Sequence, residues 1–312
     1  MAHIVPYPPM TIPPAELLVW YHRVRRDLPW RQPGVTAWQI LVSEFMLQQT
    51  PVARVLPLWR EWVQRWPTAS ATAAASPADV LRAWGKLGYP RRAKRLHECA
   101  TVIARDHGDV VPDDVEILLT LPGVGAYTAR AVACFAYGQA VPVVDTNVRR
   151  VVARAVHGRA DAGAPSPARD HADVAQLLPH DGTAQQFSAA LMELGATVCT
   201  ARNPGCRSCP LTACNWRQAG YPAGGRPARR PQRYAGTDRQ VRGLLLDVLR
   251  TSDFPVTRAQ LDMAWLMNSA QRDRALDSLL ADGLVTQTTD GLFALVGEEN
   301  YDAARKDSTA CR

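Results

Sequence analysis

Apolar residues recur every three or four positions through most of the first 220 residues, which is the spacing of amphipathic helices. Runs with this spacing cover residues 38–47, 55–66, 80–84, 93–103, 115–121, 129–137 and 148–156. Prolines at positions 51, 67, 77, 90, 112, 122 and 142 separate the runs, where they begin or end helices. Because no convincing strand alternation appears here, the pattern predicts a compact all-α body.

The composition changes abruptly at residues 221–237, which are rich in Pro, Gly and Arg and predict a basic linker. The linker arginines can lie against phosphates or simply be solvated: Arg226, Arg229, Arg230 and Arg233. Within residues 238–296 the pattern predicts helices at 238–250, 257–265 and 270–281, then two short apolar runs around a Thr-Asp-Gly turn. This order predicts a small winged-helix-like α+β domain, and residues 297–312 are expected to form a disordered tail.

The chain carries 36 Lys+Arg against 29 Asp+Glu, a formal charge of +7. Lysine occurs only at Lys86, Lys94 and Lys306, so almost every basic residue is arginine. Arginine binds phosphate through two parallel N–H donors, which favours a polyanionic partner, although a GC-rich coding sequence would also enrich arginine. No apolar stretch is long enough to cross a membrane and the N-terminus lacks a secretory pattern, so we expect a cytoplasmic protein with reduced or metal-bound cysteines.

Four of the seven cysteines follow the spacing C-x6-C-x2-C-x4-C: Cys199, Cys206, Cys209 and Cys214. Four thiolates this close can hold either a tetrahedral zinc ion or a cubane iron–sulfur cluster. Paired C-x2-C motifs favour zinc, whereas a single C-x2-C after a longer leading loop gives the cluster a modest advantage. We therefore predict a metal or cluster site in this segment.

Residues 121–125, Leu-Pro-Gly-Val-Gly, join one predicted helix to a second that begins near Ala126. Gly123 and Gly125 allow a tight turn and leave backbone N–H groups unpaired at the positive N-terminus of the second helix. An oxyanion such as a DNA phosphate can bind at such a helix end. A glycine turn between helices is also common without any ligand, so the pattern alone leaves both interpretations open.

Two carboxylates stand next to apolar runs. Glu44 lies inside the predicted helix 38–47, where partial desolvation would raise its pKa and keep a proton available for general-acid catalysis. Asp145 precedes the predicted helix 147–156, where it can cap the helix and accept N–H bonds that keep it ionised. Singly, each is also typical of a salt bridge or a plain helix cap. Together they match the division of acid and anion roles at a glycosidic bond.

In chain order, these motifs resemble the helix-hairpin-helix base-excision DNA glycosylases, which are related to endonuclease III. The segments that carry the resemblance, followed by the cysteines, are SEFMLQQT (43–50), LGYPRRAKRLH (87–97), LPGVGAYTA (121–129), VDTNVRRV (144–151) and MELGATVC (192–199). Within that superfamily, residues 15–220 look most like the adenine-specific mismatch glycosylases of the MutY group. The resemblance implies a bacterial, nucleoid-associated and monomeric repair enzyme that removes adenine mispaired with 8-oxoguanine or guanine in double-stranded DNA.

The resemblance also implies a two-domain glycosylase fold. A six-helix barrel with the helix-hairpin-helix would span residues 30–140, and an iron–sulfur cluster domain would span residues 141–220, with residues 1–29 packed against it. The four cysteines would hold a [4Fe-4S] cluster. DNA would bind in the cleft between the domains with the target base flipped out.

Catalytic roles follow from the same resemblance. Glu44 would protonate adenine at N7 and help to handle the water, Asp145 would stabilise the cationic sugar, and Asn147 would support that site. Strand-cleaving relatives carry a lysine where this chain has Tyr127, so we expect a monofunctional enzyme that leaves an abasic site. The matched DNA contacts are Gln49 and Tyr89 for a wedge into the duplex, and Trp30, Arg31 and Leu47 for the adenine pocket.

Two features depart from the family pattern. Cys214 stands one residue earlier than the usual spacing, and residues 238–296 are too short and too helical for the Nudix-like domain with which longer relatives recognise 8-oxoguanine. Two alternatives stay open. The chain could excise another mispaired base, such as thymine from T:G pairs, or it could be a non-enzymatic DNA-binding iron–sulfur protein.

Overall fold

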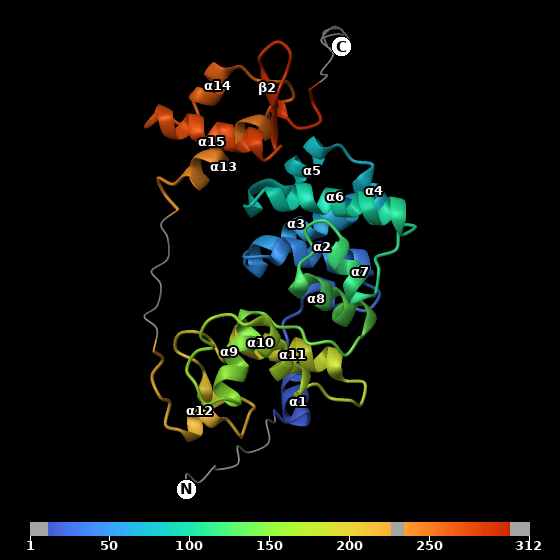
Figure 1. Cartoon of the computed structure of the whole chain (residues 1–312), viewed down its shortest axis with the longest axis vertical. Helices are drawn as coiled ribbons and strands as arrows, with labels where there is room; N and C mark the ends of the chain where they lie inside the picture. Colours follow the sequence, from blue (N-terminus) through green and yellow to red (C-terminus); the bar gives the residue numbers. More distant parts are fainter. Residues whose placement is uncertain (1–11, 226–233, 300–312) are drawn as a thin grey trace. The chain divides into compact units, whose positions relative to one another are not determined.

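The computed structural model describes residues 12–225 and 234–299 and divides the chain into two compact units (Figure 1). Among the described residues, the first unit comprises 12–41, 112–120 and 124–225, and the second comprises 42–111, 121–123 and 234–299. The four linker arginines and residues 300–312 of the expected tail lie outside the described residues. Within the described ranges, no helix is long and apolar enough to span a membrane.

The first unit consists of helices that pack around α11. Its elements are α1 (Pro14–Val24), η1 (Pro29–Arg31), α7 (Val115–Thr120), α8 (Ala126–Tyr137), α9 (Thr146–Ala155), α10 (Pro167–Ala175), α11 (Ala184–Thr197), η3 (Cys206–Ser208) and α12 (Asn215–Gln218). Helices α1 and α10 begin with proline, whose fixed φ suits the first helical position. α11 contacts α1, α8 and α9, and Leu17, Val151 and Phe187 from three of these helices share one core. Val151 lies in a run that the apolar spacing predicts, whereas Leu17 and Phe187 lie outside the predicted runs.

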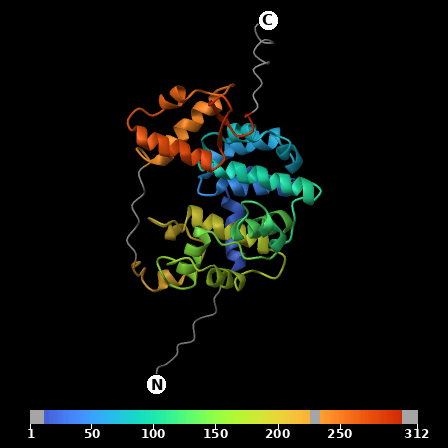
Figure 2. The same cartoon turned by 45° about the horizontal axis from the view of Figure 1, so that its top comes forward.

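Residues 42–111 form the first part of the second unit. They contain the end of α2 (Ala37–Leu47), α3 (Val52–Arg65), α4 (Ala69–Ala73), α5 (Pro77–Trp84), η2 (Gly85–Leu87) and α6 (Arg91–Asp106). α6, the long teal helix of Figure 2, packs on α4 and α5. Trp62 and Trp84 are buried and meet edge to face, with ring centroids 6.0 Å apart. Thr68 and Ser76 start α4 and α5 by accepting a backbone N–H three residues ahead.

The C-terminal module, defined as residues 234–299, is the second part of this unit. It contains α13 (Asp238–Thr251), α14 (Arg258–Asp262), α15 (Ser269–Ala281), β1 (Val285–Gln287) and β2 (Phe293–Leu295), drawn in orange and red in Figure 1. The strands pair antiparallel, with Val285 opposite Leu295. Helix α14 ends three residues before the predicted end at 265, and the apolar side chain of Met263 is exposed, so the spacing there does not mark a core face. The prediction of a mostly helical chain with a small C-terminal sheet is confirmed.

Candidate active site

The turn between α7 and α8 requires glycine at one position. Gly123 has φ +79°, a conformation that L side chains rarely adopt. A Cβ there would lie 2.7 Å from Arg95 Cβ and 2.8 Å from Phe45 Cε1. Gly125 is the N-cap of α8 and provides no side-chain hydrogen bond to the first N–H groups of that helix. The structure therefore has the tight turn and the uncapped helix N-terminus that phosphate binding requires.

Asp145 is the N-cap of α9. Its Oδ1 accepts a hydrogen bond from the backbone N–H of Val148 at 2.7 Å, and its Oδ2 accepts one from the side-chain amide of Asn147 at 2.8 Å. Burial nevertheless raises the pKa of Asp145 above its ordinary value of 3.8, because desolvation outweighs these hydrogen bonds. The cap is present where the sequence predicts it, but burial opposes the ionisation that the capping hydrogen bonds favour.

The side-chain amide of Asn147 is held from both sides. Its nitrogen donates to Asp145, while its oxygen accepts a hydrogen bond from Arg150 Nη2 at 2.6 Å. Arg150 also donates to the backbone oxygens of Cys199, at 2.7 Å, and of Gly195, at 2.6 Å. A continuous series of contacts therefore runs from the Asp145 carboxylate to the backbone of the first clustered cysteine. Sequence analysis did not predict this role for Arg150.

Close packing of α11 on α9 supports these contacts. A Cβ at Gly195 would lie 2.7 Å from Asn147 Cβ and 2.8 Å from Asn147 O. Only glycine therefore allows the two helices to approach this closely at the residue that holds Asp145.

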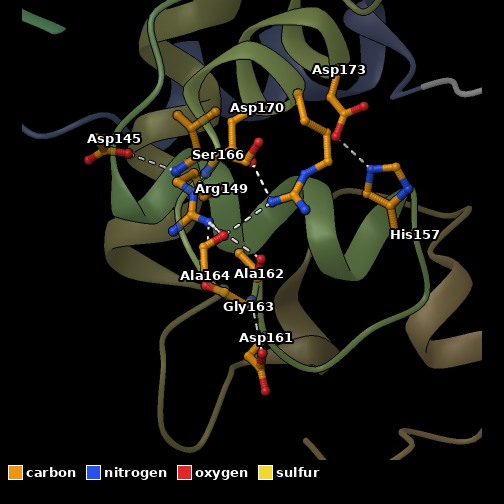
Figure 3. Close-up of polar contacts among 12 residues, drawn as sticks. Asp145, Arg149, His157, Asp161, Ala162, Gly163, Ala164, Ser166, Asp170 and Asp173 are labelled. Carbon is orange, nitrogen blue, oxygen red and sulfur yellow. Dashed lines mark hydrogen bonds and ion pairs between the residues drawn. The ribbon is translucent and has the colours of Figure 1, made fainter. Parts of the chain in front are cut away.

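Ion pairs to α10 anchor the other side of α9 (Figure 3). Arg149 Nε lies 2.6 Å from Asp170 Oδ2, and both side chains are largely buried. His157, just after α9, pairs with Asp173 of α10, with Nε2 2.8 Å from Oδ2. These contacts hold the helix whose first turn carries Asp145.

Glu44 lies in α2 and is 6% exposed. Its neighbours Ser43 and Phe45 are buried still more completely. Glu44 is therefore buried, as its place inside an apolar helix predicts. Leu47, the last residue of α2, is half-buried.

Two loop residues with positive φ flank one buried arginine. Gln49 (φ 53°) and Tyr89 (φ 48°) both adopt the left-handed conformation that is uncommon for side chains other than glycine. Arg92 donates to the backbone oxygens of Gln48, at 2.6 Å, and of Gly88, at 3.0 Å, which immediately precede them. Burial lowers the pKa of Arg92 to about 10, so it stays charged at neutral pH. One guanidinium thus connects the two loops, a role that sequence analysis missed.

Arg31 of η1 forms an ion pair with the buried Glu193. Trp30, which precedes it in η1, is buried. Arg31 Nη1 lies 2.8 Å from Oε2 of Glu193 in α11, and Arg26 Nε lies 2.7 Å from Oε1. Burial alone would raise the pKa of Glu193, but the hydrogen bonds from both arginines hold it below its ordinary value. Sequence analysis missed Glu193, although an acidic residue inside an apolar helix is the same signal that singled out Glu44.

Tyr127 lies in the first turn of α8. Its half-buried ring packs beside the core formed by Ala131, Cys134 and Val143. Helix α8 contains no lysine, and its one cationic residue is Arg130. The helix therefore offers no amine for a Schiff base.

The clustered cysteines line one small cavity, together with Arg154 and Trp216: Cys199, Cys206, Cys209 and Cys214. Arg154 Nη1 lies 3.4 Å from Cys199 Sγ, and the guanidinium lies 4.7 Å from the centroid of the Trp216 ring. No three His, Cys, Asp or Glu side chains in the described part of the chain converge on a single metal-ion position. Four thiols that line one cavity are a donor set that fits an iron–sulfur cluster, because each thiolate of a cubane binds its own iron.

Comparison with known proteins agrees with this geometry. Residues 42–169 match the family model of the HhH-GPD superfamily base excision DNA repair proteins. The chain is 75% identical to an adenine DNA glycosylase of Mycobacterium tuberculosis (strain CDC 1551 / Oshkosh), over 96% of this chain and 99% of that one. It is also 75% identical to an adenine DNA glycosylase of Mycolicibacterium smegmatis, over 93% of this chain and 98% of that one.

Among solved structures, a thermostable thymine-DNA glycosylase matches with a TM-score of 0.60 and 27% identity, over 66% of this chain and 95% of that one. The chain therefore belongs to the HhH-GPD superfamily of base excision DNA repair proteins, and within that superfamily to the adenine DNA glycosylases. The family predicted from the sequence motifs is confirmed.

Proposed function

We propose that this protein hydrolyses the N-glycosidic bond of adenine mispaired with 8-oxoguanine or guanine in double-stranded DNA. The observation that carries the proposal is the 75% identity to adenine DNA glycosylases over nearly the whole chain. Glu44 and Asp145 supply the two carboxyl groups that glycosidic cleavage uses.

In the proposed reaction Glu44 is the general acid. Its carboxyl donates a proton to adenine N7, so the electron pair of the breaking C1′–N9 bond leaves on a neutral base. Asp145 acts as the anion that stabilises the positive charge developing on the sugar, while Asn147 holds it in place. Water then adds to C1′ and returns a proton to Glu44. The products are free adenine and an abasic site.

Tyr127 supports a monofunctional reaction. A strand-cleaving glycosylase needs an amine that forms a Schiff base with the sugar, and α8 provides none. The DNA backbone therefore stays intact after base removal.

The proposed DNA contacts come from the loops and the helix end already described. The uncapped N-terminus of α8 after Gly125 binds a phosphate. Gln49 and Tyr89 enter the duplex beside the lesion, from loops that Arg92 connects. Trp30, Arg31 and Leu47 are the proposed contacts to the adenine base, from their match to the family pattern.

We infer that a [4Fe-4S] cluster is held by Cys199, Cys206, Cys209 and Cys214. These cysteines would hold the cluster, and their binding to it would fix the loop between α11 and α12. The chain's own residues then connect that loop to the active site, because the Cys199 carbonyl accepts a hydrogen bond from Arg150. Iron and sulfide analysis of the purified protein tests this inference. One zinc ion per chain would contradict it.

We also propose how the chain is divided into domains. Residues 30–140 form a six-helix barrel, residues 141–220 together with α1 form the cluster domain, and residues 238–296 form a winged-helix-like domain. Three helices followed by an antiparallel hairpin support the last assignment.

A second candidate function is removal of thymine from T:G pairs, because a thymine-DNA glycosylase shares 27% identity and the fold. The test incubates the full chain with duplexes containing A:8-oxoG, A:G, T:G or A:T and identifies each released base by mass spectrometry. Adenine is expected from the first two duplexes. Release of thymine from T:G without adenine from A:8-oxoG would replace the proposal, and tight binding without any base release would indicate a non-enzymatic DNA-binding protein.

A further inference from the structure

The C-terminal module contacts α5 through paired arginines. Arg82 of α5 places Nη1 2.6 Å from Oε1 of Glu298, and its Nη2 donates to the backbone oxygen of Ser252 at 3.1 Å. In return, Arg250 of the module donates to the backbone oxygen of Leu81 at 3.0 Å. The module and α5 therefore each donate hydrogen bonds to backbone oxygens of the other. These bonds fix the orientation of the module on α5.

A second contact lies at the start of α6. Asp282 of the module accepts a hydrogen bond from Arg242 at 2.6 Å and lies 3.5 Å from Arg91 of α6. Lys94 Nζ donates to the backbone oxygen of Asp282 at 3.1 Å. A Cβ at the adjacent Gly283 would lie only 2.6 Å from Lys94 Nζ. The module therefore sits directly against the helix that follows Tyr89.

A third contact reaches Tyr89 itself. The guanidinium carbon of Arg239, in the first turn of α13, lies 4.9 Å from the centroid of the Tyr89 ring. That of Arg92 lies 5.5 Å from the same centroid. Tyr89 is 38% exposed, so packing covers its side chain only in part. A guanidinium on the face of an aromatic ring is an attractive contact that restricts where the ring can lie.

The charge of the module does not suit it to hold DNA independently. Residues 234–299 contain six arginines against ten aspartates and glutamates. Five of these arginines form ion pairs within the second unit: Arg242, Arg250, Arg258, Arg272 and Arg274. The net negative charge disfavours a general phosphate-binding surface. If the module contributes to DNA binding, it must therefore do so through a particular residue.

We propose that Arg239 is a positioning residue for Tyr89, and that the C-terminal module thereby completes the DNA-reading surface of this glycosylase. The contact holds the Tyr89 ring ready to enter the duplex, so less side-chain freedom is lost when DNA binds. This inference rests on the proposed function, in which Tyr89 is the duplex wedge.

The test is a double-mutant cycle on the full chain, with affinity for an A:8-oxoG duplex measured by fluorescence anisotropy. We expect Arg239→Ala to weaken binding about fivefold, the upper effect of an exposed cation–π contact, with the single-turnover rate at saturating DNA unchanged. In a Tyr89→Ala background, Arg239→Ala is expected to have no further effect. Arg274→Ala is the matched control, because it removes an exposed arginine from the same module.

Two outcomes would overturn the inference. Equal weakening in both backgrounds would show that Arg239 acts on DNA without Tyr89, and unchanged binding by Arg239→Ala would show that the contact has no role. Failure of the proposed function would be seen in base release and not in the double-mutant cycle. If the wild-type chain released thymine or no base, the coupling between Arg239 and Tyr89 would still appear in the binding measurements.

Discussion

The side-chain amide of Asn147 donates to Asp145 Oδ2 at 2.8 Å, and the same amide is fixed in orientation because its oxygen accepts from Arg150 at 2.6 Å. The carboxylate proposed to stabilise the sugar cation is therefore positioned by an arginine it does not touch. Since Arg150 also binds the Cys199 carbonyl, the cysteine loop helps to hold the same arrangement.

Removing Arg150 tests this arrangement. Arg150→Ala leaves the Asn147 amide free to turn away from Asp145, so we expect adenine release to slow about 10- to 100-fold, as for loss of hydrogen bonds to a charged group worth about 1.5–3 kcal/mol. Single-turnover rates on an A:8-oxoG duplex measure the effect. Arg169→Ala, which removes an exposed ion pair with Asp170, is the control and should change the rate less than twofold. An unchanged rate in Arg150→Ala would contradict the positioning role.

The acid side of the pH–rate profile reports the ionisation of Asp145. Burial raises the pKa of Asp145, so kcat/KM should fall, as pH is lowered, at a pH above the ordinary aspartate value of 3.8. The hydrogen bond from Asn147 favours the ionised form, and Asn147→Ala removes it. We therefore expect the acid limb of Asn147→Ala to move to higher pH. A limb that stays in place or moves to lower pH would show that this hydrogen bond does not stabilise the carboxylate.

Gly195→Ala tests the close approach of α9 and α11. The new Cβ would meet Asn147 Cβ at 2.7 Å and Asn147 O at 2.8 Å, so the helices must separate. We expect the free energy of unfolding to fall by about 1–3 kcal/mol and excision to be lost. Gly243→Ala in α13 is the control, because its Cβ meets only Tyr234 Oη at 3.3 Å. Wild-type stability and activity in Gly195→Ala would refute the steric argument.

Glu193 should contribute to stability in a pH-dependent manner. Its pKa is lower in the folded chain than in the unfolded one, so its stabilising effect is present above an unfolded pKa near 4.5 and is lost as pH falls through the folded value. Glu193→Gln is expected to reduce the unfolding free energy by about 2–3 kcal/mol at pH 7, less than for a fully buried pair because Arg26 is partly exposed. Denaturant unfolding at pH 7 and below pH 4.5 should show the difference shrinking in acid. Exposed Glu61→Gln is the control, and an equal loss at both pH values would rule out the ionised pair as the cause.

Features of this protein that depend on residues close together in the chain could be predicted from the sequence. The helices follow apolar spacing, the N-cap at Asp145 follows its place before a helix, and the glycine turn follows its two glycines. The cysteines that line one cavity are close in the chain, so their proximity needed little tertiary information.

Other features arise only from tertiary packing. Glu193 pairs with Arg26, which lies 167 residues away in the sequence, and no pattern in either segment predicts this pairing. The pKa of Asp145 depends on how deeply the fold buries it, which the capping motif does not reveal. The positive φ of Tyr89 could not be predicted from its residue type, because this conformation is uncommon outside glycine.

In the proposed reaction Glu44 protonates adenine and Asp145 stabilises the sugar cation that is left. The most direct measurement is the amount of free adenine released from an A:8-oxoG duplex in a single turnover by wild-type protein and by Glu44→Gln. We predict that the wild type releases adenine and leaves an unbroken strand, while Glu44→Gln binds the duplex as tightly but releases adenine at least about 100-fold more slowly, as expected for loss of a general acid. Adenine release by Glu44→Gln at the wild-type rate would contradict the general-acid role of Glu44.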